Sequence, residues 1–459
     1  MSSINSESHQ TDANSEEGSC MRQIAGRNVR PKIWTHIAVV ILGVVAVIPS
    51  QVAAQGRTEV DNRIQQYTVT ELPGLGGSTS LAESINNRSW VSGWSNLPGD
   101  QSQHAALWAV GHVTDLGTLG GPSSSIGNPV HNEVGELAGY ANTAQLDPLN
   151  ENFCALGGTN VCRGFVLRDG RMQSLPTLGG NNSYANSMNN RGMIVGEAET
   201  VVKDPNCVSP QVLDFRAVVW GPTLGEIRAL LPLPGDSVSA ALTINDLGQV
   251  AGASGNCGPI AFQTSAHAVL WQNGSVIDLG SLGGAFNNLA LDMNELGQIA
   301  GISDLEDDTT THGFLWKNGH MIDLGTLPGD NYSLAFGINN RGQVVGQSCD
   351  PAGNCRAFLW QNGVMTDLNA LKSPNSSLYL VIAISINDFG EIVGQAFDPN
   401  SGNLPAYLAI PTDGSAGTGS ASEAQVGANA KVTLPENVRR QLRQRHGFAP
   451  FGAGLIRPQ

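Results

Sequence analysis

Cysteine pairing is the chemistry that the sequence indicates most clearly. Apart from Cys20 near the N-terminus, the cysteines fall in polar segments and are even in number: Cys154, Cys162, Cys207, Cys257, Cys349 and Cys355. In a chain with an export signal, an even set of this kind favours disulfide bonds over free thiols. We expect the first two and the last two to pair within their own loops. Cys207 and Cys257 would then join two neighbouring repeats.

Histidine and arginine share one position of a repeated unit: His104, His267 and His312 in three units, and Arg163, Arg216 and Arg356 in three others. A ring of metal ligands would not tolerate arginine at half of its positions. Matching positions of different units would also lie far apart in a ring of repeats. We therefore expect donors at the start of a strand, bonded to a neighbouring unit, and no bound metal.

Four acidic residues crowd one segment and could hold Ca²⁺ through carboxylate oxygens: Asp304, Glu306, Asp307 and Asp308. Their spacing matches neither an EF-hand loop nor a calcium-binding nonapeptide repeat. A solvated acidic loop is the favoured interpretation, and calcium is the alternative. No other cofactor is expected.

No catalytic residue stands out. The sequence contains no G-x-S-x-G nucleophile elbow and no zinc-type spacing of His and Cys. Its Gly-Gly pairs lack the following helix and the glycine spacing of a phosphate-binding loop. Two acidic residues suited to glycoside hydrolysis could meet in space, but the sequence does not identify a pair.

Internal repetition is the strongest pattern in the chain. Seven copies of a Leu-Gly-Thr-Leu-Gly-Gly motif, some of them loose, begin at residues 72, 116, 175, 231, 279, 324 and 368. The spacing of 44 to 59 residues is close to the roughly 40 to 50 residues of known propeller repeats.

Each unit is predicted to form four short strands, as the sixth unit illustrates. Residues 333–338 and 343–347 flank an Asn-x-x-Gly turn, and residues 356–360 and 364–368 flank Asn362-Gly363, a pair typical of a type I′ hairpin. Strands that are apolar on both faces are buried on both faces, as stacked blades require. We predict an all-β, seven-bladed β-propeller of four-stranded repeats. A linear β array and a pair of sandwiches are the alternatives.

The two ends of the repeat array are offset by one strand. The last unit stops at its third strand, residues 406–410, whereas Tyr67 to Leu72 precede the first unit and match a fourth strand. We expect this N-terminal strand to complete the last blade, because closing the ring hides free sheet edges. The predicted parts are a signal peptide (1–54), a short lead (55–66), the propeller (67–411), a Gly/Ser/Ala linker (412–430) and a basic tail (431–459).

An export signal is predicted at the N-terminus. Four basic residues between 22 and 32 precede the apolar run 37–48, and Val52-Ala53-Ala54 follows as a small-residue cleavage pattern. The run is short against the roughly 20 residues that span a bilayer, so cleavage after Ala54 is favoured over retention as an anchor. We expect a secreted, extracellular or cell-envelope protein with no membrane span after cleavage. The start codon stays open between Met1 and Met21.

The pattern of turns and strands in each unit resembles the repeat of a known family. The Asn-x-x-Gly turn, the third strands and the Asp-Leu-Gly-x-Leu-Gly-Gly connection resemble the HAF repeat of bacterial extracellular proteins over residues 67–411. No copy spells His-Ala-Phe in full, and His312-Gly-Phe and Arg356-Ala-Phe are among the nearest. The resemblance implies an exported, surface-associated repeat protein and no established activity.

Net charge and loop length narrow the range of functions that the sequence allows. The net charge of -15 argues against nucleic acid as a partner. Segments between second and third strands are longest in units two to four, at 140–162, 197–215 and 253–266, and variable loops on a rigid scaffold usually carry binding. We favour a monomeric, non-catalytic module that binds an unknown glycan or surface protein with these loops. A secreted propeller-type glycoside hydrolase or polysaccharide lyase is the alternative.

Overall fold

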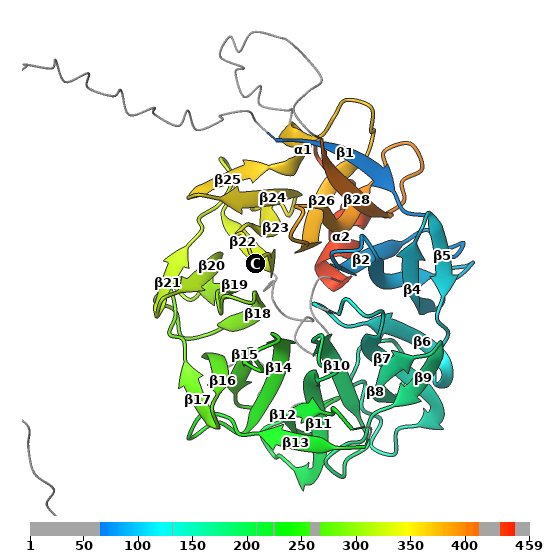
Figure 1. The fold of residues 1–459 in the computed structure, drawn as a ribbon, viewed down its shortest axis with the longest axis vertical. Helices are drawn as coiled ribbons and strands as arrows, with labels where there is room; N and C mark the ends of the chain where they lie inside the picture. The colour runs from blue at the N-terminus through cyan, green and yellow to red at the C-terminus, as the bar shows by residue number, and fades with distance from the viewer. Residues whose placement is uncertain are drawn as a thin grey trace, which may run out of the picture. The chain divides into compact units, whose positions relative to one another are not determined.

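The computed structural model describes residues 65–130, 132–207, 209–223, 225–257, 267–412 and 432–445. The predicted signal peptide, nearly all of the linker and half of the basic tail lie outside these residues. The described strands form seven four-stranded antiparallel sheets arranged in a ring (Figure 1). The prediction of an all-β, seven-bladed propeller is therefore confirmed.

Each blade runs from a first strand near the axis to a fourth strand at the rim (Figure 1). The first strands are β2 (Ser80–Ile85), β6 (Gly120–Ile126), β10 (Ser183–Met188), β14 (Val238–Ile244), β18 (Leu289–Met293), β22 (Tyr332–Ile338) and β26 (Tyr379–Ile386). The second strands are β3 (Val91–Asn96), β7 (Leu137–Leu146), β11 (Ile194–Lys203), β15 (Val250–Gly255), β19 (Ile299–Asp304), β23 (Val344–Cys349) and β27 (Ile392–Phe397).

The third strands are β4 (Gln103–Ala109), β8 (Asn160–Arg168), β12 (Leu213–Trp220), β16 (His267–Gln272), β20 (Thr311–Lys317), β24 (Cys355–Gln361) and β28 (Ala406–Thr412). The fourth strands are β5 (His112–Asp115), β9 (Arg171–Ser174), β13 (Ile227–Leu230), β17 (Ser275–Asp278), β21 (His320–Asp323), β25 (Val364–Asp367) and, for the last blade, β1 (Gln66–Glu71).

The N-terminal strand closes the ring as predicted. β1 pairs antiparallel with β28, from Gln66 opposite Thr412 to Glu71 opposite Tyr407. Tyr67 and Tyr407 are fully buried in this blade. The apolar side chains of β1 thus fill the last blade, and its backbone groups satisfy an edge that would otherwise be open.

The Asn-x-x-Gly turns join the blades to one another. The side-chain oxygen of each asparagine caps its own turn, as when Asn189 accepts from the N–H groups of Arg191 and Met193. Its side-chain nitrogen donates to the backbone carbonyl of the equivalent asparagine in the next blade. The closed series runs Asn86, Asn132, Asn189, Asn245, Asn294, Asn339, Asn387 and back to Asn86. Ser89, which replaces the turn glycine in the first unit, adopts a φ of 59°.

A β-bulge in the first strand of six blades leaves one residue without a partner on the second strand. In the first blade Ala82 lies opposite Gly93 and Ser84 opposite Ser92, so Glu83 is the extra residue. Gly93 is required here, because a Cβ atom would clash with the Leu81 carbonyl oxygen. A bulge re-aims the side chain it carries. The bulged residues are Glu83, Asn186, Leu242, Leu291, Phe336 and Ile384.

All three predicted disulfides are present: Cys154 with Cys162, Cys349 with Cys355, and Cys207 with Cys257. The last joins loops of the third and fourth blades, with Cα atoms 4.6 Å apart. The ring makes this pair possible, because equivalent loops of adjacent blades are neighbours on one face.

Two helices accompany the strands in the described residues. The expected fourth strand at 364–368 ends at Asp367, because that side chain caps the short helix α1 (Leu368–Leu371). The second helix, α2 (Glu436–Arg445), follows Leu434, and Leu434 and Val438 are buried beside the Cys349–Cys355 disulfide. Neither helix has the length and apolar character needed to cross a bilayer.

Candidate functional site

A cavity of about 320 Å³ opens on the face formed by the loops between second and third strands. Its rim consists of residues 100–103, from the first blade, and residues 154–157, from the long loop of the second blade. Deeper, it is lined by side chains that point toward the propeller axis. We call this cavity the central pocket. Its volume lies at the lower end of the range usual for small-ligand sites.

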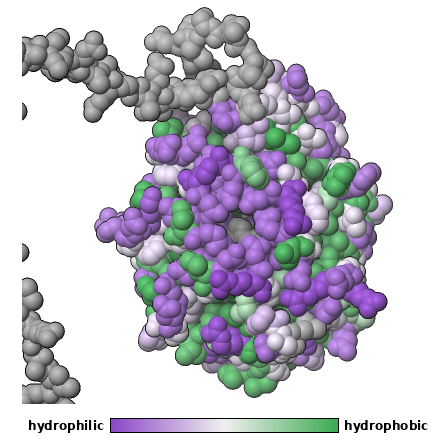
Figure 2. Space-filling view, viewed as in Figure 1, coloured by the Kyte–Doolittle hydropathy of each residue, from purple (hydrophilic) through white to green (hydrophobic). Residues whose placement is uncertain are grey.

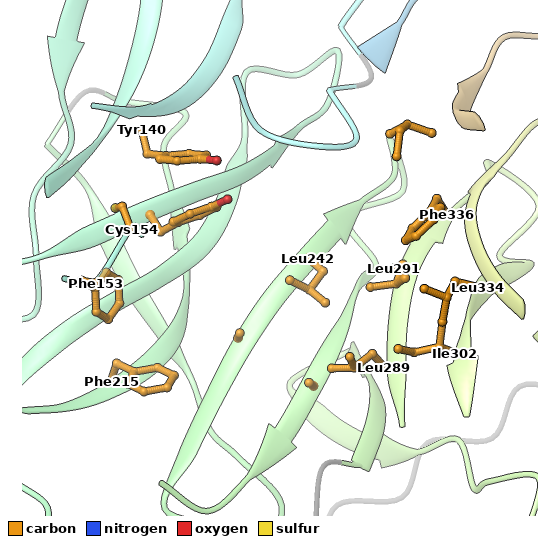
Figure 3. Close-up of a cluster of buried hydrophobic side chains, with 14 of the residues drawn as sticks. Tyr140, Phe153, Cys154, Phe215, Leu242, Leu289, Leu291, Ile302, Leu334 and Phe336 are labelled. Atoms are coloured by element: carbon orange, nitrogen blue, oxygen red, sulfur yellow. The ribbon is translucent and has the colours of Figure 1, made fainter. Parts of the chain in front are cut away.

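One side of the central pocket is apolar. Leu81 of the first blade, Phe336 of the sixth, and Ile382 and Ile384 of the seventh line it. Phe336 and Ile384 are bulged residues, so the bulge directs their side chains toward the axis. These side chains belong to one buried cluster that surrounds the axis (Figure 3). A ligand in the pocket would meet a hydrophobic surface contributed by three blades.

The other side carries a chain of hydrogen-bonding groups. Ser125 Oγ donates to Glu83 Oε2 over 2.9 Å, and the Trp94 indole also bonds the Glu83 carboxyl. The Tyr140 hydroxyl is hydrogen-bonded to Ser125 and to Tyr184, whose ring stacks on that of Tyr140 with centroids 3.8 Å apart. In Figure 3 the Tyr140 hydroxyl points toward the space bordered by Leu242, Leu291 and Phe336. Polar groups therefore face the apolar wall across the pocket.

The inner wall of the central pocket carries acidic groups whose pKa values are raised. Burial raises the pKa of Glu83 to about 8, although the hydrogen bonds from Ser125 and Trp94 oppose the rise. Burial likewise raises the pKa of Tyr140 and Tyr184 well above the usual tyrosine value. No Lys, Arg or His is among the described residues that line the pocket. At neutral pH the inner wall thus presents hydroxyl and carboxyl groups without net charge.

Asn128 Oδ1 and Glu197 Oε1, near the axis, have no hydrogen-bond partner among the described residues. Asn128 Oδ1 is buried and belongs to the lining of the central pocket. Glu197 Oε1 is buried nearby, and its carboxyl accepts from Asn186 through the other oxygen over 2.8 Å. Burial raises the pKa of Glu197 well above that of an ordinary carboxyl, with the Asn186 bond opposing the rise. Unsatisfied buried acceptors are uncommon in folded proteins and mark places where a ligand or water can bind.

The long loops of the second and third blades are fastened by a second group of buried carboxyls. Glu151 Oε1 accepts from the N–H groups of Val212 and Leu213, and Gln211 Nε2 donates to both Glu151 and Glu199. Burial raises the pKa of Glu151 and of Glu199, so the pair does not carry two charges at neutral pH. A side-chain hydrogen bond also joins the two carboxyls, and it opposes the rise in the pKa of Glu151.

The opposite end of the axis has a smaller cavity of about 100 Å³, lined by the turns between first and second strands. Its polar groups form hydrogen bonds between the blades. The side chain of each residue that follows the turn asparagine accepts a hydrogen bond from a backbone N–H of the preceding blade. The acceptors are Glu133, Asn190, Asp246, Glu295, Asn340, Asp388 and Asn87. Hydrophilic residues surround the centre of the face in view in Figure 2. The hydrogen bonds that close the ring account for the polar groups around this smaller cavity, whereas they do not account for those of the central pocket.

Each histidine of the shared repeat position pairs through Nδ1 with an aspartate of its own blade: His104 with Asp115, His267 with Asp278 and His312 with Asp323. The expectation of a bond to a neighbouring unit is wrong for the histidines, because the hairpin places the start of the third strand beside the end of the fourth. Burial opposes ionisation of Asp323, but the bonds from His312 and Gly325 N–H hold its pKa below the usual range. Arginine at this repeat position does reach beyond its own blade, because Arg216 donates a hydrogen bond to the Ser237 carbonyl in the connection to the next blade.

The acidic loop proposed for calcium has its carboxylates directed to separate partners. Asp304 accepts from Asn287 and Thr311, and Asp308 accepts from the Ala285 N–H. Hydrogen bonds from Thr309 and Thr310 lower the pKa of Asp307 to about 2. Among the described residues, no three of the four carboxylates, Glu306 included, gather within 4.8 Å of one another. The solvated acidic loop stays the prediction, with calcium binding as its alternative.

The sequence patterns missed the central pocket. A signal was nevertheless present, because Ser80-Leu-Ala-Glu-Ser-Ile85 aligns with Ser333-Leu-Ala-Phe-Gly-Ile338 and places Glu83 where the sixth unit has Phe336. Of the three loops expected to bind ligand, only that of the second blade lines the pocket among the described residues. The first blade's shorter loop takes part instead. Residues 258–266 lie outside the described residues.

Comparisons with known proteins find distant structural similarities only. No protein-family model matches the sequence, and no curated protein matches it. A puromycin-hydrolysing peptidase of Mycobacterium tuberculosis aligns with 76% of this chain at 13% identity and a TM-score of 0.46, and the alignment spans 55% of that protein. A gluconolactonase of Xanthomonas campestris aligns over 76% of this chain and 91% of its own, at 8% identity and a TM-score of 0.35. A lectin of Aleuria aurantia aligns over 75% and 100%, at 9% identity and a TM-score of 0.29.

Proposed function

We propose that this protein is an exported, non-catalytic β-propeller that binds a glycan in the central pocket. The observation that carries the proposal is the pairing of two surfaces across the axis. The hydrogen-bonded chain from Glu83 to Tyr184 faces the apolar wall formed by Leu81 and Phe336. A sugar ring needs both kinds of surface, because its hydroxyl groups form hydrogen bonds while its C–H faces pack on apolar side chains.

Binding fits the carboxyl groups better than glycoside hydrolysis does. A glycosidase needs one carboxyl protonated and its partner ionised, so the two environments must push the pKa values apart. Glu83 and Glu197, two carboxyls near the axis, both have a raised pKa, so neither has the environment of a nucleophile or general base. The Asp100 carboxylate, at the rim, already accepts hydrogen bonds from Ser78 and Asn96. A hydrolase or lyase acting on polysaccharide is therefore the second choice.

Export is part of the proposal. The three disulfides are compatible with an oxidising compartment, and the predicted signal sequence supplies a route to one. The HAF-type repeats would then belong to a secreted or cell-envelope protein. N-terminal sequencing of exported material should begin at Gln55. Material that retains residues 37–48 would show that the segment is kept as an anchor.

The test of glycan binding is an array of glycans and proteins probed with the mature chain, residues 55–459. We expect glycan hits that weaken at least about tenfold in Tyr140→Phe, which removes one hydroxyl from the chain that lines the pocket. Tyr407→Phe is the matched control, since that hydroxyl is buried in the last blade away from the pocket. Mass spectrometry of each glycan hit after incubation checks for cleavage. Released oligosaccharide would replace the binding function by a hydrolase or lyase.

A further inference from the structure

Helix α2 is fastened to the face of the propeller on which the central pocket opens. The Leu434 N–H donates to Asn354 Oδ1 over 3.0 Å, and Arg439 Nη1 donates to the Ala352 carbonyl over 2.9 Å. Both acceptors lie in the loop between β23 and β24, which are the second and third strands of the sixth blade. Leu434 and Val438 are buried beside the same loop. The start of the basic tail is thus held at a fixed place on the pocket face.

The anchored helix lies next to the apolar wall of the central pocket. Val381 of β26 packs in the cluster that buries Leu434 and Val438, and the next residue, Ile382, lines the pocket. Consecutive Cα atoms are only about 3.8 Å apart. Figure 1 shows α2 beside β26. One strand therefore carries both the anchor of the tail and part of the pocket wall.

Residues 446–459 follow α2 in the sequence and lie outside the described residues. They read His-Gly-Phe-Ala-Pro-Phe-Gly-Ala-Gly-Leu-Ile-Arg-Pro-Gln, with large apolar side chains at Phe448, Phe451, Leu455 and Ile456 and no acidic residue. Extended, such a segment spans roughly 45 Å. Helix α2 is only about 15 Å long. The segment is therefore long enough to reach back from the end of α2 to the pocket wall beside the anchor.

We propose that residues 446–459 bind in the central pocket of their own chain, with Phe448 and Phe451 against its apolar wall, and compete there with an external ligand. This proposal goes beyond glycan binding, because it gives the pocket an occupant that the chain itself supplies. The contact is with the wall of the sixth and seventh blades. The rim formed by residues 100–103 and 154–157, from the first two blades, is left to the external ligand.

The chemistry of the pocket suits this occupant. Phe336, Ile382 and Ile384 form a hydrophobic surface that a phenylalanine ring can cover. The lining includes the carboxyl groups of Glu83 and Asp100, and no Lys, Arg or His is among its described residues. A segment without acidic residues brings no like charge to these carboxyls. Because α2 is tethered nearby, the segment is present at a high effective concentration, and a modest contact is enough to populate the bound state.

Photocrosslinking in the mature chain, residues 55–459, locates the segment. The photoreactive residue p-benzoylphenylalanine takes the place of Phe448, and mass spectrometry maps the products that retain the monomer mass. We expect crosslinks to β22 and β26 at the wall residues Phe336, Ile382 or Ile384. The control carries the same photoreactive residue in place of Leu247, which is exposed on the turn face of the fourth blade. It should not crosslink to the wall.

A synthetic peptide of residues 446–459 gives an independent measurement. In the full-length double variant Phe448→Ser and Phe451→Ser, the segment no longer covers the wall, so the pocket is open to the peptide. Calorimetry should show that this variant binds the peptide at least about tenfold more tightly than the wild type does. A peptide with the same two serines is the control and should bind neither protein.

Each measurement can overturn the proposal. Crosslinks from position 448 that miss the wall would do so, as would equal behaviour of the two proteins toward the peptide, absence of binding included. Neither measurement uses a glycan. A failure of the chain to bind any glycan therefore leaves the proposal in place, and a segment that lies elsewhere leaves glycan binding in place.

Discussion

The side-chain amide of Asn387, in the last blade, donates a hydrogen bond to the backbone carbonyl of Asn86, in the first, across 3.1 Å of space and 301 positions of sequence. The same bond joins every other pair of adjacent blades. The junction between the two ends of the chain is therefore built like the internal junctions. The scaffold under the central pocket is a continuous ring.

Asn387→Ala should lower the free energy of unfolding by about 1 to 3 kcal/mol, because a buried backbone carbonyl and the turn N–H groups lose their partner. Asn339→Ala, at an internal junction, should cost the same within about 0.5 kcal/mol. Denaturant unfolding measures both, with the exposed Asn400→Ala as the control. A cost at Asn339 together with none at Asn387 would mean that the ends of the chain do not contribute to a closed ring.

The N-terminal strand should contribute to stability through one face only. Tyr67→Ala removes a side chain that is 1% exposed and should cost about 3 kcal/mol or more. Thr68→Ala, at the adjacent exposed position of the same strand, should change stability by less than about 0.5 kcal/mol. Thermal or denaturant unfolding measures the difference. Similar small effects at both positions would contradict the pairing of β1 with β28.

The bridge between the third and fourth blades can be tested chemically. Non-reducing peptide mapping should find Cys207 linked to Cys257, and replacing both by serine should lower stability by about 4 kcal/mol on the loop-entropy model for a separation of 50 residues. Replacing Cys349 and Cys355, only 6 residues apart, should cost less. Free thiols at Cys207 and Cys257 would contradict the adjacency of these loops.

The carboxyl pair that fastens the long loops should make the protein less stable in alkali. Burial raises the folded-state pKa of Glu151 and Glu199, so their contribution to stability is full below the unfolded-state pKa and is lost as pH rises through the raised values. Glu151→Gln keeps a side-chain oxygen that can accept from the N–H groups of Val212 and Leu213 and removes one of the two titrating groups. The loss of unfolding free energy between about pH 5 and about pH 9 should shrink by about 1 to 3 kcal/mol in this variant.

The control for that measurement is Glu226→Gln, at an exposed carboxyl with no part in the loop contacts. Its pH profile should follow the wild type. An identical profile for Glu151→Gln would mean that the two loop carboxyls are not coupled in the folded protein.

The ring was predictable because the residues that build it recur in every unit. Asn at the first turn and the second-strand glycine each meet one local requirement and recur in all seven units, and the Asn-Gly hairpin recurs in three. The Cys207–Cys257 bridge followed from the same register. The His–Asp pairs were misassigned because strand starts were assumed to face the next blade, whereas the hairpin places the aspartate within reach first.

The central pocket was not predictable because it depends on positions where the units differ. Glu83, Leu242 and Phe336 occupy the same bulged position in three blades. When the repeats are compared, such a position looks like an ordinary core position at which the side chain varies. Only the closed ring brings a glutamate of the first blade into one cavity with a phenylalanine of the sixth, and only burial at the axis raises the pKa of that glutamate.

Hydrogen–deuterium exchange with and without a bound oligosaccharide tests the central claim most directly, because it locates the ligand on the propeller. We predict protection in residues 96–103 and 154–157, at the rim of the central pocket, and in β2, which carries Glu83. The turns around Asn190 and Asn340, on the opposite face, should exchange as in the free protein. Protection confined to those turns, with none at the rim of the central pocket, would contradict the proposed binding site.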